Sequence, residues 1–222
     1  MKKGLIFDLD GTLVDSLPGI AATLNRCLAT HGFPEHSDAA VRTFVGDGLR
    51  KLIERATPRQ TGPEQTQALV ALFKKDYETL WQQGTPPFPG IPDLLHQLQQ
   101  NGHPLAILSN KPHEVTGTIV RTVFPTIHFQ AVLGQQDGTP LKPDPASALR
   151  IAGQLGLAPA DCILIGDSSI DIQTAANAGM SSVAVDWGYH DRDKLTAAGA
   201  KLIAATPTEL TATLEAQPDT TA

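Results

Sequence analysis

From residue 88 to residue 216, short apolar runs alternate with segments whose apolar residues recur at helical spacing. This alternation predicts a parallel sheet covered by helices, because each crossover between parallel strands has room for a helix. The run Lys3–Phe7 adds a buried strand, since a short apolar stretch bounded by polar residues suits a strand better than a helix. The expected strands are 3–7, 104–108, 131–134, 162–165, 182–185 and a weaker one near 201–204, and the expected helices are 92–101, 113–123, 145–156, 170–179 and 207–215.

Residues 16–82, which follow the first strand, carry helical periodicity and no strong strand candidate. Ser16 followed by Pro18 is typical of a helix start, with the serine as cap and the proline in the first turn. The segment Gly84–Gly90 contains three prolines and two glycines and is the clearest break in the chain. A separate helical module is therefore expected before the alternating region.

The predicted fold class is α/β, with a Rossmann-like parallel sheet as the core and a helical cap domain inserted after the first strand. The core is assigned to residues 1–15 and 88–222 and the cap domain to residues 16–87, and residues 217–222 are expected to fray. A chain of 222 residues with 41% hydrophobic residues can bury a core of this size without disulfides or structural metals.

Composition excludes several classes of function. The net charge is −6 and no run of lysine or arginine occurs, which argues against a nucleic-acid partner. The N-terminal apolar run stops at Asp8, too early for a signal peptide, and no other stretch approaches a membrane span. Cys27 and Cys162 give neither a disulfide framework nor metal-site spacing. We therefore expect a cytoplasmic protein without a membrane partner, either monomer or homodimer.

Polar residues cluster where the predicted strands end. Ligands of open parallel sheets bind at the carboxyl ends of the strands, so these residues should converge on one crevice. They are Asp8, Asp10 and Thr12 after strand 3–7, Ser109, Asn110 and Lys111 after strand 104–108, Lys142 before helix 145–156, and Asp167 and Asp171 after strand 162–165.

The pair Asp8 and Asp10 has two interpretations. If the strand continues, both carboxylates lie on the same side and repel each other, which makes a purely structural pairing costly. Alternatively, Asp10 and Gly11 simply form a turn. The further acids and the lysine expected at the same sheet edge favour the functional interpretation.

Four motifs in this order resemble those of the haloacid dehalogenase-like hydrolases. They are Asp8–Leu13 (DLDGTL), Ser109–Lys111 (SNK), Lys142–Pro143 (KP) and Gly166–Asp171 (GDSSID). The resemblance covers nearly the whole chain and includes the helical insertion after the first motif. Within that superfamily the sequence is most similar to phosphoglycolate phosphatases and their near relatives, although Ser168 stands where relatives often have threonine.

The resemblance implies a role for each motif. Asp8 would be the nucleophile that forms an aspartyl-phosphate, and Asp10 would protonate the leaving alcohol and then activate water. Mg²⁺ would be the cofactor, with Asp171 either as a direct ligand or as support for the others. The implied metal-site residues are Asp8, Asp10 (through its backbone carbonyl), Asp167 and Asp171, and the implied phosphate-binding residues are Thr12, Ser109, Asn110 and Lys142.

These residue types suit phosphoryl transfer independently of the resemblance. The reaction needs positioning and charge stabilisation, which carboxylate ligands of Mg²⁺ and a lysine supply. A carboxyl group that donates a proton near neutrality needs a raised pKa, and the neighbouring acids can raise that of Asp10. Lys142 and Mg²⁺ would keep Asp8 ionised, and these opposed environments would separate the two roles.

Basic and glycine residues outside these roles leave alternatives open. The loop containing Gly46 and Gly48 precedes a helical pattern and could bind an anion, or it could merely shape a turn. Arg42 and Arg50 flank this loop and could meet the carboxylate of 2-phosphoglycolate, but solvated arginines are the favoured interpretation. Lys111 is expected to be solvated, with support of the phosphate loop as the alternative.

The predicted function is Mg²⁺-dependent hydrolysis of a small phosphorylated metabolite, with 2-phosphoglycolate favoured. The alternatives within enzymes are a β-phosphoglucomutase-like or pyrophosphatase-like member of the superfamily. From other classes, a phosphoacceptor signalling domain also uses clustered aspartates and a lysine, but it ordinarily lacks the second acid two residues after the first. A non-catalytic binding protein would not need every catalytic position to be filled.

Overall fold

The computed structural model describes residues 2–217 and divides them into two compact units. One unit comprises the described residues up to Leu13 and from Pro87 onward, and the other comprises Val14–Pro86. The fraying expected for the C-terminal residues falls, apart from Gln217, outside the described part. No helix among the described residues has the length and apolar character that crossing a membrane requires.

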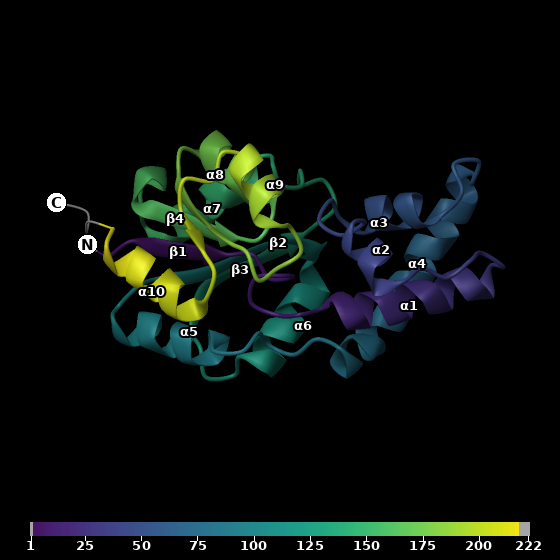
Figure 1. Ribbon diagram of the computed structural model, residues 1–222, viewed down its shortest axis with the longest axis horizontal. Helices are drawn as coiled ribbons and strands as arrows, with labels where there is room; N and C mark the ends of the chain where they lie inside the picture. Colours follow the sequence, from purple (N-terminus) through teal and green to yellow (C-terminus); the bar gives the residue numbers. More distant parts are fainter. Residues whose placement is uncertain (1, 218–222) are drawn as a thin grey trace. The chain divides into compact units, whose positions relative to one another are not determined.

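The first unit is built on a six-stranded sheet (Figure 1). Its order is β3-β2-β1-β4-β5-β6, and every neighbouring pair is parallel. The strands are β1 (Gly4–Phe7), β2 (Leu105–Pro112), β3 (Phe129–Gln135), β4 (Cys162–Gly166), β5 (Ser181–Val185) and β6 (Ile203–Ala204). The predicted α/β fold with a parallel sheet is confirmed.

Helices cover both faces of this sheet. Figure 1 shows α7, α8 and α9 on one face and α5, α6 and α10 on the other. For α5 to α9, which connect successive strands, this division follows from right-handed crossovers: the helices lie on one face where the chain moves from β1 toward β3 and on the other where it moves toward β6. The helices are α5 (Ile91–Gln100), α6 (His113–Val123), α7 (Ala146–Leu155), α8 (Ser169–Ala178), α9 (Arg192–Ala197) and α10 (Pro207–Glu215), with a short 3₁₀ helix at Pro159–Asp161.

The central strands form the core of this unit. Leu5, Ile6 and Phe7 of β1 are fully buried, as is every residue of β4. Near-continuous apolar sequence is typical of strands that are covered on both faces, which is why these segments lack the alternation of a half-exposed strand. Because β1 lies inside the sheet, the residues that follow it reach the middle of the sheet edge.

The second unit is helical. It contains α1 (Leu17–Thr30), α2 (Asp38–Arg42), α3 (Leu49–Ala56) and α4 (Pro63–Leu80), followed by a 3₁₀ turn at Trp81–Gln83. Helix α1 packs against α4 through buried stripes at helical spacing, and the rings of Phe73 and Tyr77 stack at 5.2 Å. Trp81 is buried in this helical core.

The two segments that connect the units run side by side. The Asp15 amide donates to the Pro86 carbonyl at 2.9 Å, and the Gly19 amide donates to the Gly84 carbonyl at 3.0 Å. A Cβ on Gly84 would lie 2.7 Å from the Gly19 nitrogen, so this approach requires glycine. The two ends of the helical insertion therefore lie next to each other in space, although they are far apart in the sequence.

Candidate active site

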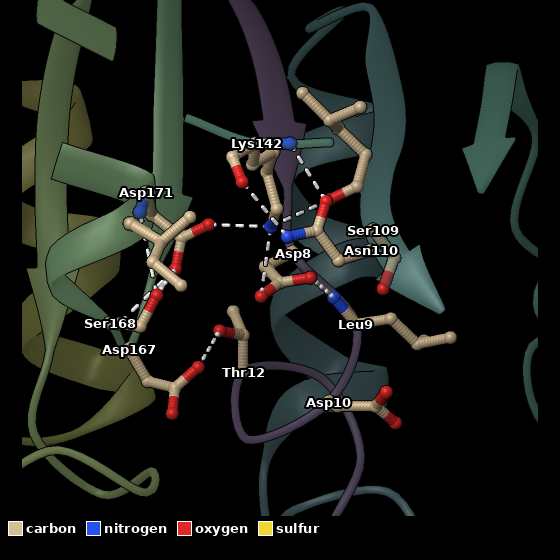
Figure 2. Close-up of polar contacts among 12 residues, drawn as sticks. Asp8, Leu9, Asp10, Thr12, Ser109, Asn110, Lys142, Asp167, Ser168 and Asp171 are labelled. Carbon is tan, nitrogen blue, oxygen red and sulfur yellow. Dashed lines mark hydrogen bonds and ion pairs between the residues drawn. The ribbon is translucent and has the colours of Figure 1, made fainter. Parts of the chain in front are cut away.

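Carboxylates and a lysine from distant parts of the sequence meet at the carboxyl ends of the central strands (Figure 2). Asp8 directly follows β1, Asp167 follows β4, and Asp171 lies in the first turn of α8. Lys142 comes from the loop between β3 and α7. The convergence expected from parallel strand ends is thus present in the structure.

Lys142 is the central cation of this cluster. Its Nζ lies 3.0 Å from Asp8 Oδ2 and 2.6 Å from Asp171 Oδ1, and it donates to the Leu108 carbonyl at 3.2 Å. The side chain is buried, and burial alone would lower the pKa of Lys142. The carboxylates of Asp171 and Asp8 outweigh that effect and raise the pKa above its ordinary value. Lys142 is therefore a fixed positive charge beside Asp8.

Asn110 holds the backbone of Lys142 in place. The Lys142 amide donates to Asn110 Oδ1 at 2.8 Å, and Asn110 Nδ2 donates to the Lys142 carbonyl at 3.2 Å. The side-chain amide of Asn110 thus bridges to the loop that carries the lysine. Its predicted contact with phosphate stays a prediction, as does that of Ser109, whose hydroxyl accepts from the Lys111 amide at 3.2 Å.

Both carboxylate oxygens of Asp171 are engaged. Oδ1 bonds Lys142, while Oδ2 accepts from the Ser168 amide at 3.1 Å and from the Ser168 hydroxyl at 2.6 Å. Ser168 and Asp171 form a reciprocal capping box at the start of α8, which fixes the aspartate where the helix begins. This arrangement suits the supporting role for Asp171 at least as well as direct ligation.

Asp167 is held by neutral donors. The Thr12 hydroxyl donates to Oδ1 at 3.0 Å, and the Tyr189 amide donates to Oδ2 at 2.7 Å. Gly188 packs directly against Asp167, and the Trp187 indole donates to the Thr12 carbonyl at 3.1 Å. The Thr12 hydroxyl, predicted to bind phosphate, thus contacts Asp167 in this structure. Sequence reasoning did not assign the contacts of Gly188 and Tyr189, although their place after a strand was a usable signal.

Burial raises the pKa values of two of the site's aspartates and so favours their protonated forms. Desolvation raises the pKa of Asp8 to about 7, with Lys142 opposing and Asp171 and Asp10 adding to the rise. Desolvation also raises the pKa of Asp167 to about 8, with further contributions from Asp8 and Asp171. Such acids are stabilised in the ionised form when a cation lies between them.

The acidic cluster fits a divalent cation. Asp8, Asp167 and Asp171 each offer an oxygen, and these oxygens lie within 4.8 Å of one another. Carboxylate oxygens are the ligands that Mg²⁺ prefers in proteins. The predicted ligand Asp10 does not belong to this cluster by its side chain, and the resemblance implied only its backbone carbonyl.

The carboxylate of Asp10 points away from Asp8 and Lys142 (Figure 2). Lys111 Nζ lies 2.9 Å from Asp10 Oδ1 and 3.1 Å from Oδ2. The expectation of a solvated Lys111 is wrong, because the residue is only 8% exposed. Spacing alone could not show this pairing, since its members are 101 positions apart in the sequence.

The candidate specificity residues belong to the helical unit. Arg42 ends α2 and is exposed, while Arg50 is exposed and donates to Gln67. Gly46 and Gly48 both have positive φ, 120° and 83°, and Gly48 directly precedes α3. The glycines therefore shape the loop, and a contact of any of these residues with substrate stays a prediction.

The fold and the site together define an α/β protein with an acidic, lysine-containing centre at the edge of a parallel sheet. The chain belongs to the haloacid dehalogenase-like hydrolase family, whose model matches residues 5–185. It is an enzyme of that family, and the resemblance inferred from its four motifs is confirmed.

Individual relatives agree with this assignment. A phosphoglycolate phosphatase of Yersinia pestis is 36% identical over 192 residues, which cover 85% of this chain and 82% of that protein. A phosphoglycolate phosphatase of Escherichia coli K12 is 35% identical over 208 residues, with the same shares covered. The crystal structure of a protein from Lactobacillus delbrueckii subsp. bulgaricus, described as a phosphoglycolate phosphatase, superposes on this chain with a TM-score of 0.91 at 32% identity. The superposition covers 96% of this chain and 99% of that one.

Proposed function

We propose that this protein is a Mg²⁺-dependent phosphomonoester hydrolase that forms an aspartyl-phosphate on Asp8 and acts on 2-phosphoglycolate. The observation that carries the mechanism is the buried Asp8 carboxylate, 3.0 Å from Lys142 Nζ and grouped with Asp167 and Asp171. The substrate is inferred from relatives that are named phosphoglycolate phosphatases. A small phosphorylated metabolite is therefore the partner that the site would take.

Asp8 is oriented for attack by two contacts. The Leu9 amide donates to Oδ1 at 2.6 Å, and Lys142 pairs with Oδ2. In the first step a bond forms between an Asp8 oxygen and phosphorus while the bond from phosphorus to the alcohol oxygen breaks. Bound Mg²⁺, held by Asp8, Asp167 and the Asp10 carbonyl with support from Asp171, would neutralise charge on the transferring group.

Asp10 would move the protons of both steps. Its carboxyl group gives a proton to the departing alcohol, which leaves Asp10 ionised. The ionised carboxylate then takes a proton from water as the water oxygen attacks phosphorus. The bond from Asp8 to phosphorus breaks, inorganic phosphate leaves, and both aspartates return to their starting states.

The protein is proposed to work in the cytoplasm.

The helical unit is proposed to act as a cap that selects the substrate. Closing a cap excludes water during transfer, and opening it admits the hydrolytic water. Arg42, Arg50 or the Gly46–Gly48 loop would meet the substrate carboxylate. Replacing Arg42 or Arg50 by Gln should raise KM for 2-phosphoglycolate and leave KM for a phosphate ester without a carboxylate unchanged.

The decisive experiment is steady-state hydrolysis of a panel of phosphate esters with Mg²⁺. The panel contains 2-phosphoglycolate, sugar phosphates, nucleotides and pyrophosphate, and it compares wild type with Asp8→Asn. We expect selectivity for 2-phosphoglycolate and a loss of kcat of at least ~10³-fold in the variant, because the nucleophile is removed. Acid-quenched wild-type protein should carry phosphate on the peptide that contains Asp8.

A matched control replaces another acid of the same unit. Asp161 precedes β4, at the end of the strand opposite Asp167, and pairs with Lys3 at 3.2 Å, so Asp161→Asn should keep wild-type turnover. Turnover that survives Asp8→Asn would overturn the mechanism. Selectivity for another ester, abolished by Asp8→Asn, would keep the mechanism and remove the substrate, and conversion of a sugar phosphate to its isomer would indicate a mutase.

A further inference from the structure

We propose that Lys111 is a positioning residue that holds the carboxylate of Asp10 for proton transfer. The inference rests on the proposed function, because it assigns a task to the residue that would serve as general acid and base. It concerns a lysine that the roles described above do not use.

The contact between the two side chains is bidentate. Lys111 Nζ lies 2.9 Å from one oxygen of Asp10 and 3.1 Å from the other, so the ammonium group sits between both oxygens. The carboxylate of Asp10 turns about two side-chain bonds, and an ammonium group fixed at its oxygens restricts that rotation. Both contacts are made to the ionised carboxylate, and charge-assisted hydrogen bonds are the stronger kind. When one oxygen carries the proton for the leaving alcohol, the other oxygen still accepts from Lys111.

The ammonium group of Lys111 also needs this partner. The side chain of Lys111 is 5% exposed and that of Asp10 is 14% exposed. A buried charge is strongly destabilising unless an opposite charge compensates it, and Asp10 supplies that compensation. The pairing therefore reflects a requirement of burial rather than a chance approach of two solvated side chains.

The backbone around Lys111 is anchored. Its amide donates to the Ser109 hydroxyl at 3.2 Å, and its carbonyl accepts from the Thr116 hydroxyl at 3.2 Å. A Cβ on Gly134 of β3 would lie 2.6 Å from the same carbonyl, so the neighbouring strand also closes on this point. The lysine thus extends from a fixed strand end, which is what a residue that orients another must do.

The two buried lysines of the site pair with different aspartates. Lys142 serves Asp8 and Asp171, whereas Lys111 serves Asp10. The nucleophile Asp8 and the proton carrier Asp10 thus have separate cations. Asp10 can therefore gain or lose its proton without changing the ion pair that holds Asp8. Loss of Lys111 should consequently affect proton transfer and spare the attack by Asp8.

The test compares leaving groups. We would measure kcat/KM of wild type, Asp10→Asn, Lys111→Met and the double variant with 2-phosphoglycolate and with 4-nitrophenyl phosphate. An alkoxide leaving group needs a proton, whereas 4-nitrophenolate departs without one. Lys111→Met should therefore lose about 10²-fold on 2-phosphoglycolate, the effect expected of a misplaced catalytic group, and much less on the aryl ester. Adding Lys111→Met to Asp10→Asn should cost nothing further.

Controls keep this test decisive. Lys111→Gln keeps an NH₂ donor group but removes the charge, and it serves, alone and with Asp10→Asn, if Lys111→Met does not fold. Lys3→Met breaks a lysine–aspartate pair elsewhere in the unit and should not change kcat/KM. Equal losses on both esters, additive losses with Asp10→Asn, or wild-type rates would each overturn the proposal. Failure of the proposed function looks different, because wild type itself would not hydrolyse 2-phosphoglycolate or Asp10→Asn would show no dependence on the leaving group.

Discussion

Gly188 occupies a place in which a side chain has no room. A Cβ at this residue would lie 2.3 Å from the Asp167 Cβ and 2.3 Å from the Gly11 carbonyl oxygen. Both neighbours are held firmly, the first by Thr12 and Tyr189 and the second by its turn. The glycine therefore allows the loop after β5 to close over Asp167 and to deliver the Tyr189 amide to it.

Gly188→Ala should disturb this closure. We expect a loss of ~1–3 kcal/mol in the free energy of unfolding, typical of overpacking, and weaker Mg²⁺ binding because Asp167 must shift. Urea unfolding and calorimetric titration with Mg²⁺ would measure the two effects. Gly153→Ala is the control, since a Cβ on this α7 residue meets nothing within 4 Å and should stabilise the helix by ~0.5–1 kcal/mol. Unchanged Mg²⁺ affinity in Gly188→Ala would contradict the assigned role of the loop.

Among the elements, α8 joins helix formation directly to the site. Its first turn carries Asp171, and its cap Ser168 contacts that aspartate through both the hydroxyl and the amide. The helix cannot begin elsewhere without moving the carboxylate away from Lys142. Local capping chemistry thus places a residue of the acidic cluster.

Removing the cap should therefore have two effects. Ser168→Ala is expected to lower the free energy of unfolding by ~1 kcal/mol and also to reduce kcat/KM, because Asp171 loses a donor. Thr206 caps α10, where its hydroxyl accepts from the Glu209 amide at 3.1 Å, and Thr206→Ala should lower stability by a similar amount with unchanged kcat/KM. Thermal unfolding and steady-state kinetics of both variants would check this difference. Equal kinetics in the two variants would argue against a link between the cap and the site.

The elements themselves could be predicted where the signal was local. The apolar run of β1 and the periodicity of α4 identify a buried strand and an amphipathic helix within a few residues of sequence. Helix α9 was missed because its six residues are too few to show a period. Strand β2 runs to Pro112, beyond its predicted end at 108, because polar residues of the site continue the strand.

Contacts within the site were harder to predict than its membership. The four motifs at strand ends were enough to predict that Asp8, Lys142, Asp167 and Asp171 lie close together. The partner of Lys111 and the bridge from Asn110 to Lys142 depend on side-chain directions across neighbouring strands. Sequence spacing contains no information about those directions, so a buried lysine was expected to be solvated.

For the whole molecule, the two strongly shifted acids link stability to pH. The pKa values of Asp8 and Asp167 rise to about 7 and about 8 in the folded protein, above the ordinary value of 3.8. The folded state therefore holds protons that the unfolded state has already released. Without a cation, the stability this provides is fully present below pH ~4 and is lost as the pH rises through 7 and 8.

Added Mg²⁺ should stabilise the folded protein more strongly as the pH rises. A ligand that binds only the folded, deprotonated site adds stability, and fewer protons compete for the carboxylates as the pH rises. The melting temperature in EDTA should therefore fall between pH 5 and pH 8, while the increment from added Mg²⁺ should grow over the same range. Calorimetry in buffers of different ionisation enthalpy should show proton release on binding. A Mg²⁺ increment that shrinks with rising pH would refute the shifted acids as the metal site.

The neighbouring ends of the helical insertion have a consequence for how such enzymes diversify. The chain leaves the first unit after Leu13 and returns to it at Pro87, and the Phe88 amide donates to the Leu13 carbonyl at 3.1 Å. The ends of the insertion are therefore fixed by the first unit, whatever the number of residues between them. The cost of closing a longer loop grows only with the logarithm of its length. The insertion is thus a replaceable module, and its length and sequence can change between relatives while every charge around Asp8 stays in place.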